Sequence, residues 1–250
     1  PLGMIQSIAR GVGNLLFMSN SSAKRTTELN LTAAYPELDE QQRNQLIKAS
    51  LKSQCMTYAE SIKIWGSSPE FALAQIKQVY NAEIFLNALK NPNGSIGVVP
   101  HFGAWELMNA WINQHTHPVI MYKPSRNKDL DRFMLESRQR LNATLVPTDD
   151  TGVRALFKHL KQGGFTAILP DHIPKESGGI YSDFYGQKAF SSTLLSKLAA
   201  KTQCSVVGLT CVRRPDFSGF DIHFTALSQD INSKDLQLSV DTLNKEMERM

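Results

Sequence analysis

The chain has 250 residues, of which 42% are hydrophobic and 20% are charged, and its formal net charge is +4. This composition excludes a largely disordered protein and indicates one large globular domain, or one domain with a helical extension. The mildly basic balance favours anionic surfaces such as phospholipid headgroups. Because the basic residues are scattered and not interleaved with aromatic ones, the sequence does not favour nucleic-acid binding.

Residues 4–20 are apolar apart from one arginine and predict either a segment at a membrane interface or a helix packed on the body of the protein. No run of about eighteen apolar residues occurs, so no transmembrane helix is predicted. The chain starts with Pro-Leu-Gly-Met, which looks like the remnant of a protease site followed by an engineered start. We therefore expect that an N-terminal membrane anchor was removed.

The N-terminal third is predicted to be helical. Residues 37–65 carry apolar residues at steps of four and three, which is the pattern of an amphipathic helix. Pro69 begins a second predicted helix that runs to Ala88, and the turn sequence Asn91–Gly94 follows it. We expect residues 1–92 to form a membrane-proximal helical region and residues 93–250 to form an α/β core, both within one continuous domain.

In this core, short apolar runs alternate with helical stretches. This alternation predicts a mostly parallel central sheet sandwiched by helices. Helices are expected near residues 104–113, 127–142, 151–162 and 191–202, with a last helix from about residue 235. The expected strands are Ile96–Val99, Val119–Tyr122, Thr144–Val146, Phe165–Leu169 and an antiparallel pair formed by Ser205–Arg213 and Gly219–Leu227.

The three cysteines lie among apolar neighbours without a CxxC spacing, and they are expected to be reduced thiols in the core. His115 and His117 have no cysteine or carboxylate at ligand spacing, so no metal site is expected.

The strongest local signal is the run from Gly97 to Glu106, which reads GVVPHFGAWE. A buried strand leads to His101 at its carboxyl end, where open α/β sheets build their sites, and Gly103 permits a tight turn into a helix. Glu106 then falls in the first helical turn. If the turn brings the two side chains together, the carboxylate fixes the imidazole tautomer and leaves the other ring nitrogen as a base. The spacing alone fits equally well a histidine that only caps the helix.

The run from His101 to Glu106 resembles the His-x4-Asp/Glu motif of the lysophospholipid and glycerolipid acyltransferase superfamily. Over nearly its whole length the chain resembles the late acyltransferases of bacterial lipid A biosynthesis. The resemblance is carried in order by YPEL at residues 35–38, YKP at 122–124, Gly163–Gly164, Pro170–Asp171 and FYG at 184–186. Pro100, His172 and Tyr185 depart from the family's usual residues.

The resemblance implies an acyltransferase of the cytoplasmic face of the bacterial inner membrane. It would move a fatty acyl chain from acyl carrier protein to a hydroxyl of a lipid A precursor, with His101 as general base, Glu106 as its partner and no metal or other cofactor. Arg138 is the favoured substrate-binding arginine, expected to hold a phosphate, the phosphopantetheine or Asp171, although periodicity does not separate it from Arg140. Asp171 is expected at the same sheet edge as a substrate-binding residue that shapes the floor of the site, although a loop aspartate equally fits an Asx-turn. Residues 172–190 are expected to form a lid, with His172 as a polar lining residue rather than a second base.

Three other functions stay open. A related acyltransferase would act on a lysophospholipid or a glycolipid mannose. A thioesterase-type hydrolase would use water as acceptor, although the sequence has no Gly-x-Ser-x-Gly elbow. A non-enzymatic lipid-binding or scaffold protein would keep its function when His101 is replaced by alanine.

Overall fold

The computed structural model describes residues 1–250, apart from the side chain of Gln139, and the chain divides into two compact units. One unit is Pro1–Ile64 with the short segment Tyr185–Gln187, and the other is Trp65–Phe184 with Lys188–Met250.

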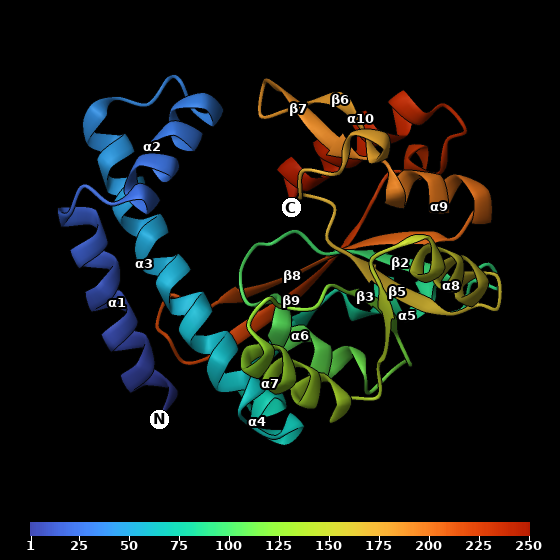
Figure 1. Cartoon of the computed structure of the whole chain (residues 1–250), viewed down its shortest axis with the longest axis horizontal. Coiled ribbons are helices and arrows are strands. Elements are labelled where there is room, and N and C mark those ends of the chain that lie inside the picture. Colours follow the sequence, from blue (N-terminus) through green and yellow to red (C-terminus); the bar gives the residue numbers. More distant parts are fainter. The chain divides into compact units, whose positions relative to one another are not determined.

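The first unit is helical, as the sequence predicts. It contains α1 (Leu2–Met18), α2 (Ser22–Ala34) and nearly all of α3 (Glu40–Trp65), which Figure 1 draws in blue to cyan. α3 confirms the amphipathic helix predicted for residues 37–65. A buried hydrogen bond of 2.7 Å from Gln6 Nε2 to Glu60 Oε1 ties α1 to α3. Within the described part of the chain, no helix has both the length and the apolar character needed to cross a bilayer.

The second unit is built on a five-stranded sheet in the order β1-β9-β8-β2-β5. Only β8 and β9 run antiparallel to each other, so the prediction of a mostly parallel sheet with one antiparallel pair is confirmed. The strands are β1 (Ile76–Tyr80), β2 (Ser95–Val98), β5 (Phe165–Ile168), β8 (Ser205–Arg213) and β9 (Phe220–Ala226).

Two smaller ladders accompany the sheet. β3 (Val119–Tyr122) pairs in parallel with β4 (Thr144–Pro147), and β3 also packs beside β5. β6 (Gly179–Phe184) and β7 (Gln187–Ser192) form a two-stranded sheet within the stretch predicted as a lid. Tyr185 and Gly186 between them both have positive φ, which is typical of tight hairpin turns.

Helices cover both faces of the five-stranded sheet (Figure 1). The helices of the second unit are α4 (Pro69–Gln75), α5 (Ala82–Ala88), α6 (Trp105–Ile112), α7 (Lys128–Gln139), α8 (Asp150–Leu160), α9 (Leu194–Thr202) and α10 (Leu236–Arg249). The prediction of one helix over residues 69–88 is wrong, because β1 interrupts it between α4 and α5. Residues 76–80 pair with β9, a strand far away in the sequence, and this pairing overrides the local helical spacing.

The strand β2 lies inside the sheet with all four residues buried, as expected for a parallel strand covered on both faces. Its Ile96 and Val98 belong to an apolar cluster with residues of α8, α9 and α10. Gly97 points to the opposite face, where a Cβ atom would lie 3.0 Å from side-chain atoms of Leu209 and Phe165. A side chain at position 97 would therefore require the side chains of Leu209 and Phe165 to move aside.

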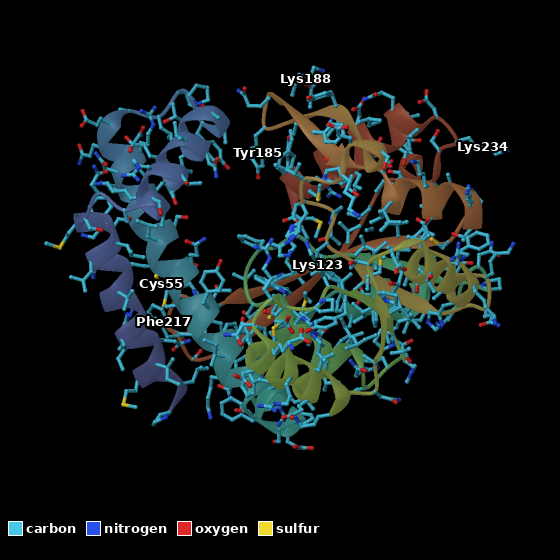
Figure 2. The ribbon with its side chains drawn as sticks, in the orientation of Figure 1. Cys55, Lys123, Tyr185, Lys188, Phe217 and Lys234 are labelled. Atoms are coloured by element: carbon cyan, nitrogen blue, oxygen red, sulfur yellow. The ribbon has the colours of Figure 1, made fainter. Side chains whose placement is uncertain are left out.

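All three cysteines are free thiols, two of them buried, and burial raises the pKa of the Cys204 thiol. The third, Cys55, lies on α3 and is partly exposed (Figure 2).

Candidate active site

The turn between β2 and α6 presents His101 at the carboxyl edge of the sheet. Gly103 has a φ of +66°, and a Cβ atom there would lie 2.1 Å from the carbonyl oxygen of Cys211 in β8. The next residue, Ala104, donates its backbone N–H to the same oxygen at 2.8 Å. The turn thus lies against the neighbouring strand, and glycine is required at position 103 both by the conformation and by this close approach.

Asp171 holds His101 at two points. One carboxylate oxygen accepts the backbone N–H of His101 at 2.7 Å, and the other contacts the ring Nδ1 at 2.8 Å. Because an ionised carboxylate only accepts hydrogen bonds, the proton of the neutral imidazole lies on Nδ1, and Nε2 is then the nitrogen with the lone pair. The His101 side chain is 31% exposed and that of Asp171 21%.

The register of the sheet explains this pairing. In the parallel ladder of β2 and β5, Val98 lies opposite Ile168. His101 and Asp171 each follow their strand by the same number of residues, so both side chains reach the same level of the sheet edge. Burial of Asp171 acts to raise its pKa, but the hydrogen bonds from His101 and the charge of its ring outweigh this effect and hold the pKa of Asp171 below its usual value.

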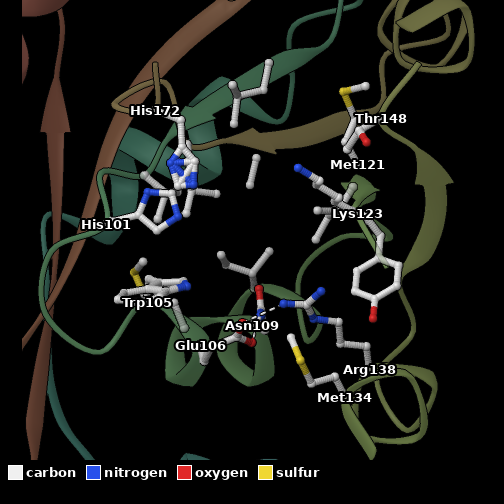
Figure 3. Close-up of a pocket in the computed structure, with 18 of the residues that line it drawn as sticks. His101, Trp105, Glu106, Asn109, Met121, Lys123, Met134, Arg138, Thr148 and His172 are labelled. Carbon is white, nitrogen blue, oxygen red and sulfur yellow. Dashed lines mark hydrogen bonds and ion pairs between the residues drawn. The ribbon is translucent and has the colours of Figure 1, made fainter. Parts of the chain in front are cut away.

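Two further rings pack around the imidazole (Figure 3). His172 stacks on His101 with ring centroids 4.0 Å apart and an angle of 12° between the planes. Trp105 meets the ring edge-on at 5.3 Å. The His101 ring is therefore held by a carboxylate and by two neighbouring aromatic rings. No role was predicted for Trp105. His172 was expected to be a polar lining residue rather than a second base, and it does line the cavity.

Glu106 contacts Arg138 and not His101. Arg138 Nη2 donates to Glu106 Oε1 at 2.6 Å, and Asn109 Nδ2 donates to the other oxygen at 3.3 Å. The side chain of Glu106 is 5% exposed and that of Arg138 19%, so the ion pair is largely buried. The expected hydrogen bond between His101 and Glu106 is therefore wrong. Of the alternatives given for Arg138, the one that pairs it with Asp171 is excluded as well, because Asp171 binds His101 and Arg138 binds Glu106.

Tyr122 fixes the helix that carries Arg138. Its hydroxyl donates to Asp131 in the first turn of α7, and the same carboxylate oxygen accepts the backbone N–H of Ser125 at 2.6 Å. The guanidinium of Arg138 lies 5.2 Å from the centre of the Tyr122 ring. Burial and the neighbouring Asp131 raise the pKa of Tyr122 to about 12, so the tyrosine stays protonated and donates.

Arg140 has a different place from Arg138. It donates to the backbone carbonyl oxygens of Trp65 and Ser67, at 3.2 Å for the latter. These carbonyls lie at the C-terminal end of α3, where a cation is favourable. The structure thus separates the two arginines that periodicity does not: Arg138 lines the site and Arg140 caps a helix end.

His101, Glu106 and Arg138 line one cavity of about 550 Å³. Apolar side chains form most of its wall, among them Trp105, Met108, Ile112, Ile120, Met121, Met134 and Leu194. In Figure 3 the two histidines lie on one side of this space, and Arg138 reaches into it from the opposite side. A cavity of this kind suits a hydrocarbon chain next to a base. Among the side chains that the structure describes, no group of three or more His, Cys, Asp or Glu residues is arranged to hold a metal ion.

The fold and the site define an α/β protein with a carboxylate-bound histidine at the mouth of an apolar cavity, and comparison with known proteins assigns its family. Residues 1–250 match the family described as bacterial lipid A biosynthesis acyltransferase, and the chain belongs to this family. The expected resemblance is thereby confirmed.

Three curated relatives have low sequence identity to the chain. The lipid A biosynthesis lauroyltransferase of Escherichia coli K12 is 22% identical, over 89% of this chain and 72% of its own length. A lipid A biosynthesis acyltransferase of Haemophilus influenzae is 24% identical, over 95% of this chain and 75% of its own length. The phosphatidylinositol mannoside acyltransferase of Mycolicibacterium smegmatis is 24% identical, over 71% of this chain and 59% of its own length.

Proposed function

We propose that this acyltransferase moves a fatty acyl group from the thioester of acyl carrier protein to a hydroxyl of a lipid A precursor, with His101 as general base. The observation that carries the proposal is the imidazole held at Nδ1 by Asp171, with Nε2 free on the wall of an apolar cavity. A base in this state is able to take a proton from an alcohol.

The proposed reaction has two proton transfers. Nε2 of His101 takes the hydroxyl proton while the oxygen attacks the thioester carbonyl carbon. The negative charge then lies on the former carbonyl oxygen, where backbone N–H groups near the turn stabilise it. Those of Phe102 and Ala104 are not among them, because they already donate to the carbonyl oxygens of Pro100 and Cys211. The C–S bond breaks, and the thiolate takes the proton back from the imidazolium. Asp171 stabilises the imidazolium throughout, and these steps require no metal or redox cofactor.

Glu106 and Arg138 serve the same site in a different way from Asp171. Their ion pair lies on the cavity wall at the first turn of α6, and Figure 3 shows the guanidinium facing the cavity. An arginine that is held by a carboxylate keeps further N–H donors in a fixed geometry. We assign the pair to binding and orienting the acceptor, with the carboxylate of Glu106 holding the arginine in place.

The membrane surface is a further proposed partner. On α1 the residues Met4, Ile8, Val12, Leu15 and Met18 are exposed. They follow one another at steps of four and three and therefore lie on one helical face. An exposed apolar face of this kind inserts into the headgroup region of a bilayer, here the inner membrane. Replacement of Ile8 and Leu15 by Asp is expected to abolish co-sedimentation with anionic phospholipid vesicles, whereas replacement of the exposed Lys77 in β1 by Asp is not.

The transfer reaction is tested with the purified chain, an acyl carrier protein thioester and a lipid A precursor, with the product measured by mass spectrometry. His101→Ala is expected to lower the rate by roughly 10²- to 10⁴-fold while the circular dichroism spectrum stays unchanged. Full activity in this variant would overturn the role of His101. Thioester hydrolysis is followed in the same reaction, and hydrolysis that outpaces transfer would favour a thioesterase.

A glycolipid mannose is the second candidate acceptor, because one relative is named as a phosphatidylinositol mannoside acyltransferase. The two acceptors are offered at equal concentration in one reaction. If only the mannoside is acylated, the acceptor is the mannoside and not the lipid A precursor.

A further inference from the structure

Lys123 is a charged residue of the cavity that the proposed chemistry does not use. It directly follows β3 and lines the same cavity as His101 and Arg138. Pro124 comes next, and a residue before proline is restricted to extended backbone conformations. In Figure 3 the amine of Lys123 points into the cavity, toward the side on which His172 lies.

The charges of the cavity leave Lys123 as the cation without a counter-ion. Glu106 neutralises Arg138 at 2.6 Å, and Asp171 faces His101 at 2.8 Å. For Lys123 no ion pair or hydrogen bond is formed with any described residue. The ammonium group is therefore available to an anion that the ligand brings, and a contact between opposite charges is a strong kind of hydrogen bond.

A second polar group lines the same cavity. His172 follows β5, which packs against β3, and its ring also lines the cavity. Lys123 and His172 are both exposed, so they border the open part of the cavity and not its apolar depth. An anionic group bound there would lie at the mouth while a hydrocarbon chain occupies the interior.

We propose that Lys123 binds a phosphate group of one of the two substrates, and so takes the role that the sequence analysis expected of Arg138. The inference rests on the proposed acyl transfer. Two substrates can supply the group: a phosphate on the acceptor lipid, or the phosphodiester of the phosphopantetheine that carries the acyl thioester. The chemistry is the same in both cases, a charge-assisted contact between an ammonium and a phosphate oxygen.

The test compares Lys123→Met with Lys128→Met, which removes the same charge five residues further on, from an exposed position that does not line the cavity. KM and kcat are measured with the acceptor before and after enzymatic removal of its phosphate. They are measured also with acyl carrier protein thioester and with an acyl-pantetheine that has no phosphate.

Lys123→Met is expected to raise the KM of the phosphate-bearing substrate by about tenfold or more, since a hydrogen bond to a charged group contributes about that factor. kcat should change by less than about threefold. Removing the phosphate from that substrate should raise the wild-type KM similarly, after which Lys123→Met has no further effect. The phosphate that Lys123 binds belongs to the substrate for which wild type and Lys123→Met have the same KM once the phosphate is removed.

Two outcomes would overturn the proposal. In one, Lys123→Met behaves as Lys128→Met does with every substrate. In the other, the effect of Lys123→Met is the same with and without phosphate. Equilibrium dialysis of the phosphorylated acceptor, without donor, measures the same difference even if no acyl transfer takes place. A failed phosphate site and a failed acyl transfer are therefore told apart.

Discussion

Replacement of Asp171 by Asn tests which carboxylate orients the imidazole. The wild-type carboxylate accepts two hydrogen bonds from His101, at 2.7 and 2.8 Å. An asparagine has one accepting oxygen and one donating NH2 group, so it satisfies only one of the two N–H groups. If the NH2 group faces Nδ1, then Nδ1 must accept, the imidazole proton lies on Nε2, and the nitrogen that should act as the base is lost.

The magnitude follows from these bonds. A hydrogen bond to a charged group contributes roughly 1.5–3 kcal/mol, and each 1.4 kcal/mol corresponds to about a factor of ten. Asp171→Asn is therefore expected to lower kcat by roughly 10- to 100-fold. The effect on KM should be small, because the carboxylate acts through His101 and does not touch the substrate.

The assay is steady-state acyl transfer with saturating donor, with Glu106→Gln as the matched carboxylate variant. If the imidazole depended on Glu106, then Asp171→Asn would keep nearly wild-type kcat and Glu106→Gln would show the larger loss. That result would refute the assignment of Asp171 as the residue that orients His101.

The same variant has a second readout in its stability at low pH. The folded-state pKa of Asp171 is held below the unfolded value of about 3.9. The ionised carboxylate therefore stabilises the fold above this pH, and the contribution is lost as the pH falls through the folded-state pKa. The difference in unfolding free energy between wild type and Asp171→Asn, measured by urea denaturation, should be constant above about pH 5 and shrink below about pH 4.

Three further variants test the ion pair, the turn and the tyrosine. Glu106→Gln should lower the free energy of unfolding by roughly 3 kcal/mol, because Arg138 is left largely buried without its carboxylate. The double variant with Arg138→Met should recover much of this loss in urea denaturation. Gly103→Ala should cost roughly 2 kcal/mol or more and lower kcat, since the new Cβ meets the Cys211 carbonyl at 2.1 Å and φ is +66°. The pKa of Tyr122 is about 12 in the folded protein, above the unfolded value of about 10, so wild-type protein should lose stability as the pH rises from about 10 toward 12. Thermal unfolding of Tyr122→Phe should not show this decline.

Each of these expectations has an outcome that contradicts it. A double variant no more stable than Glu106→Gln would show that the unpaired guanidinium is not the source of the cost. A normally stable Gly103→Ala protein would show that the turn shifts freely away from β8. An unchanged alkaline decline in Tyr122→Phe would assign it to other groups, with Tyr181→Phe as the control at an exposed tyrosine.

The strands of the core are predictable because their sequence signal is local. Short apolar runs between turn residues predicted β2, β3, β4, β5 and the β8–β9 pair within a few residues. β1 was missed because Ile76 and Tyr80 continue the spacing of Leu73, and the sequence does not reveal that β9 pairs with this segment. A local residue pattern does not indicate which distant segments pair, so this strand cannot be predicted from it.

The site follows the same division. The position of His101 at the carboxyl end of a strand is visible in the sequence, and so is that of Asp171. Their contact is not, because it depends on β2 and β5 being neighbours in a particular register. With that register known, the equal distance of the two residues from Val98 and Ile168 would have predicted the pair.

The two carboxylate pairs depend on each other energetically, and this affects how a loss of activity is interpreted. If Glu106 turned to His101, Arg138 would be left as a largely buried cation, which is the more costly arrangement. Conversely, removing the charge of Glu106 frees Arg138 to attract Asp171, the other carboxylate at this sheet edge, away from the imidazole. A loss of kcat in Glu106→Gln alone therefore does not show that Glu106 contacts His101. The double variant Glu106→Gln with Arg138→Met separates the two causes when the acceptor is a water-soluble alcohol that does not need the arginine. If the loss arises through Arg138, the double variant should recover kcat. If Glu106 acts directly at the imidazole, the double variant should be as slow as Glu106→Gln alone.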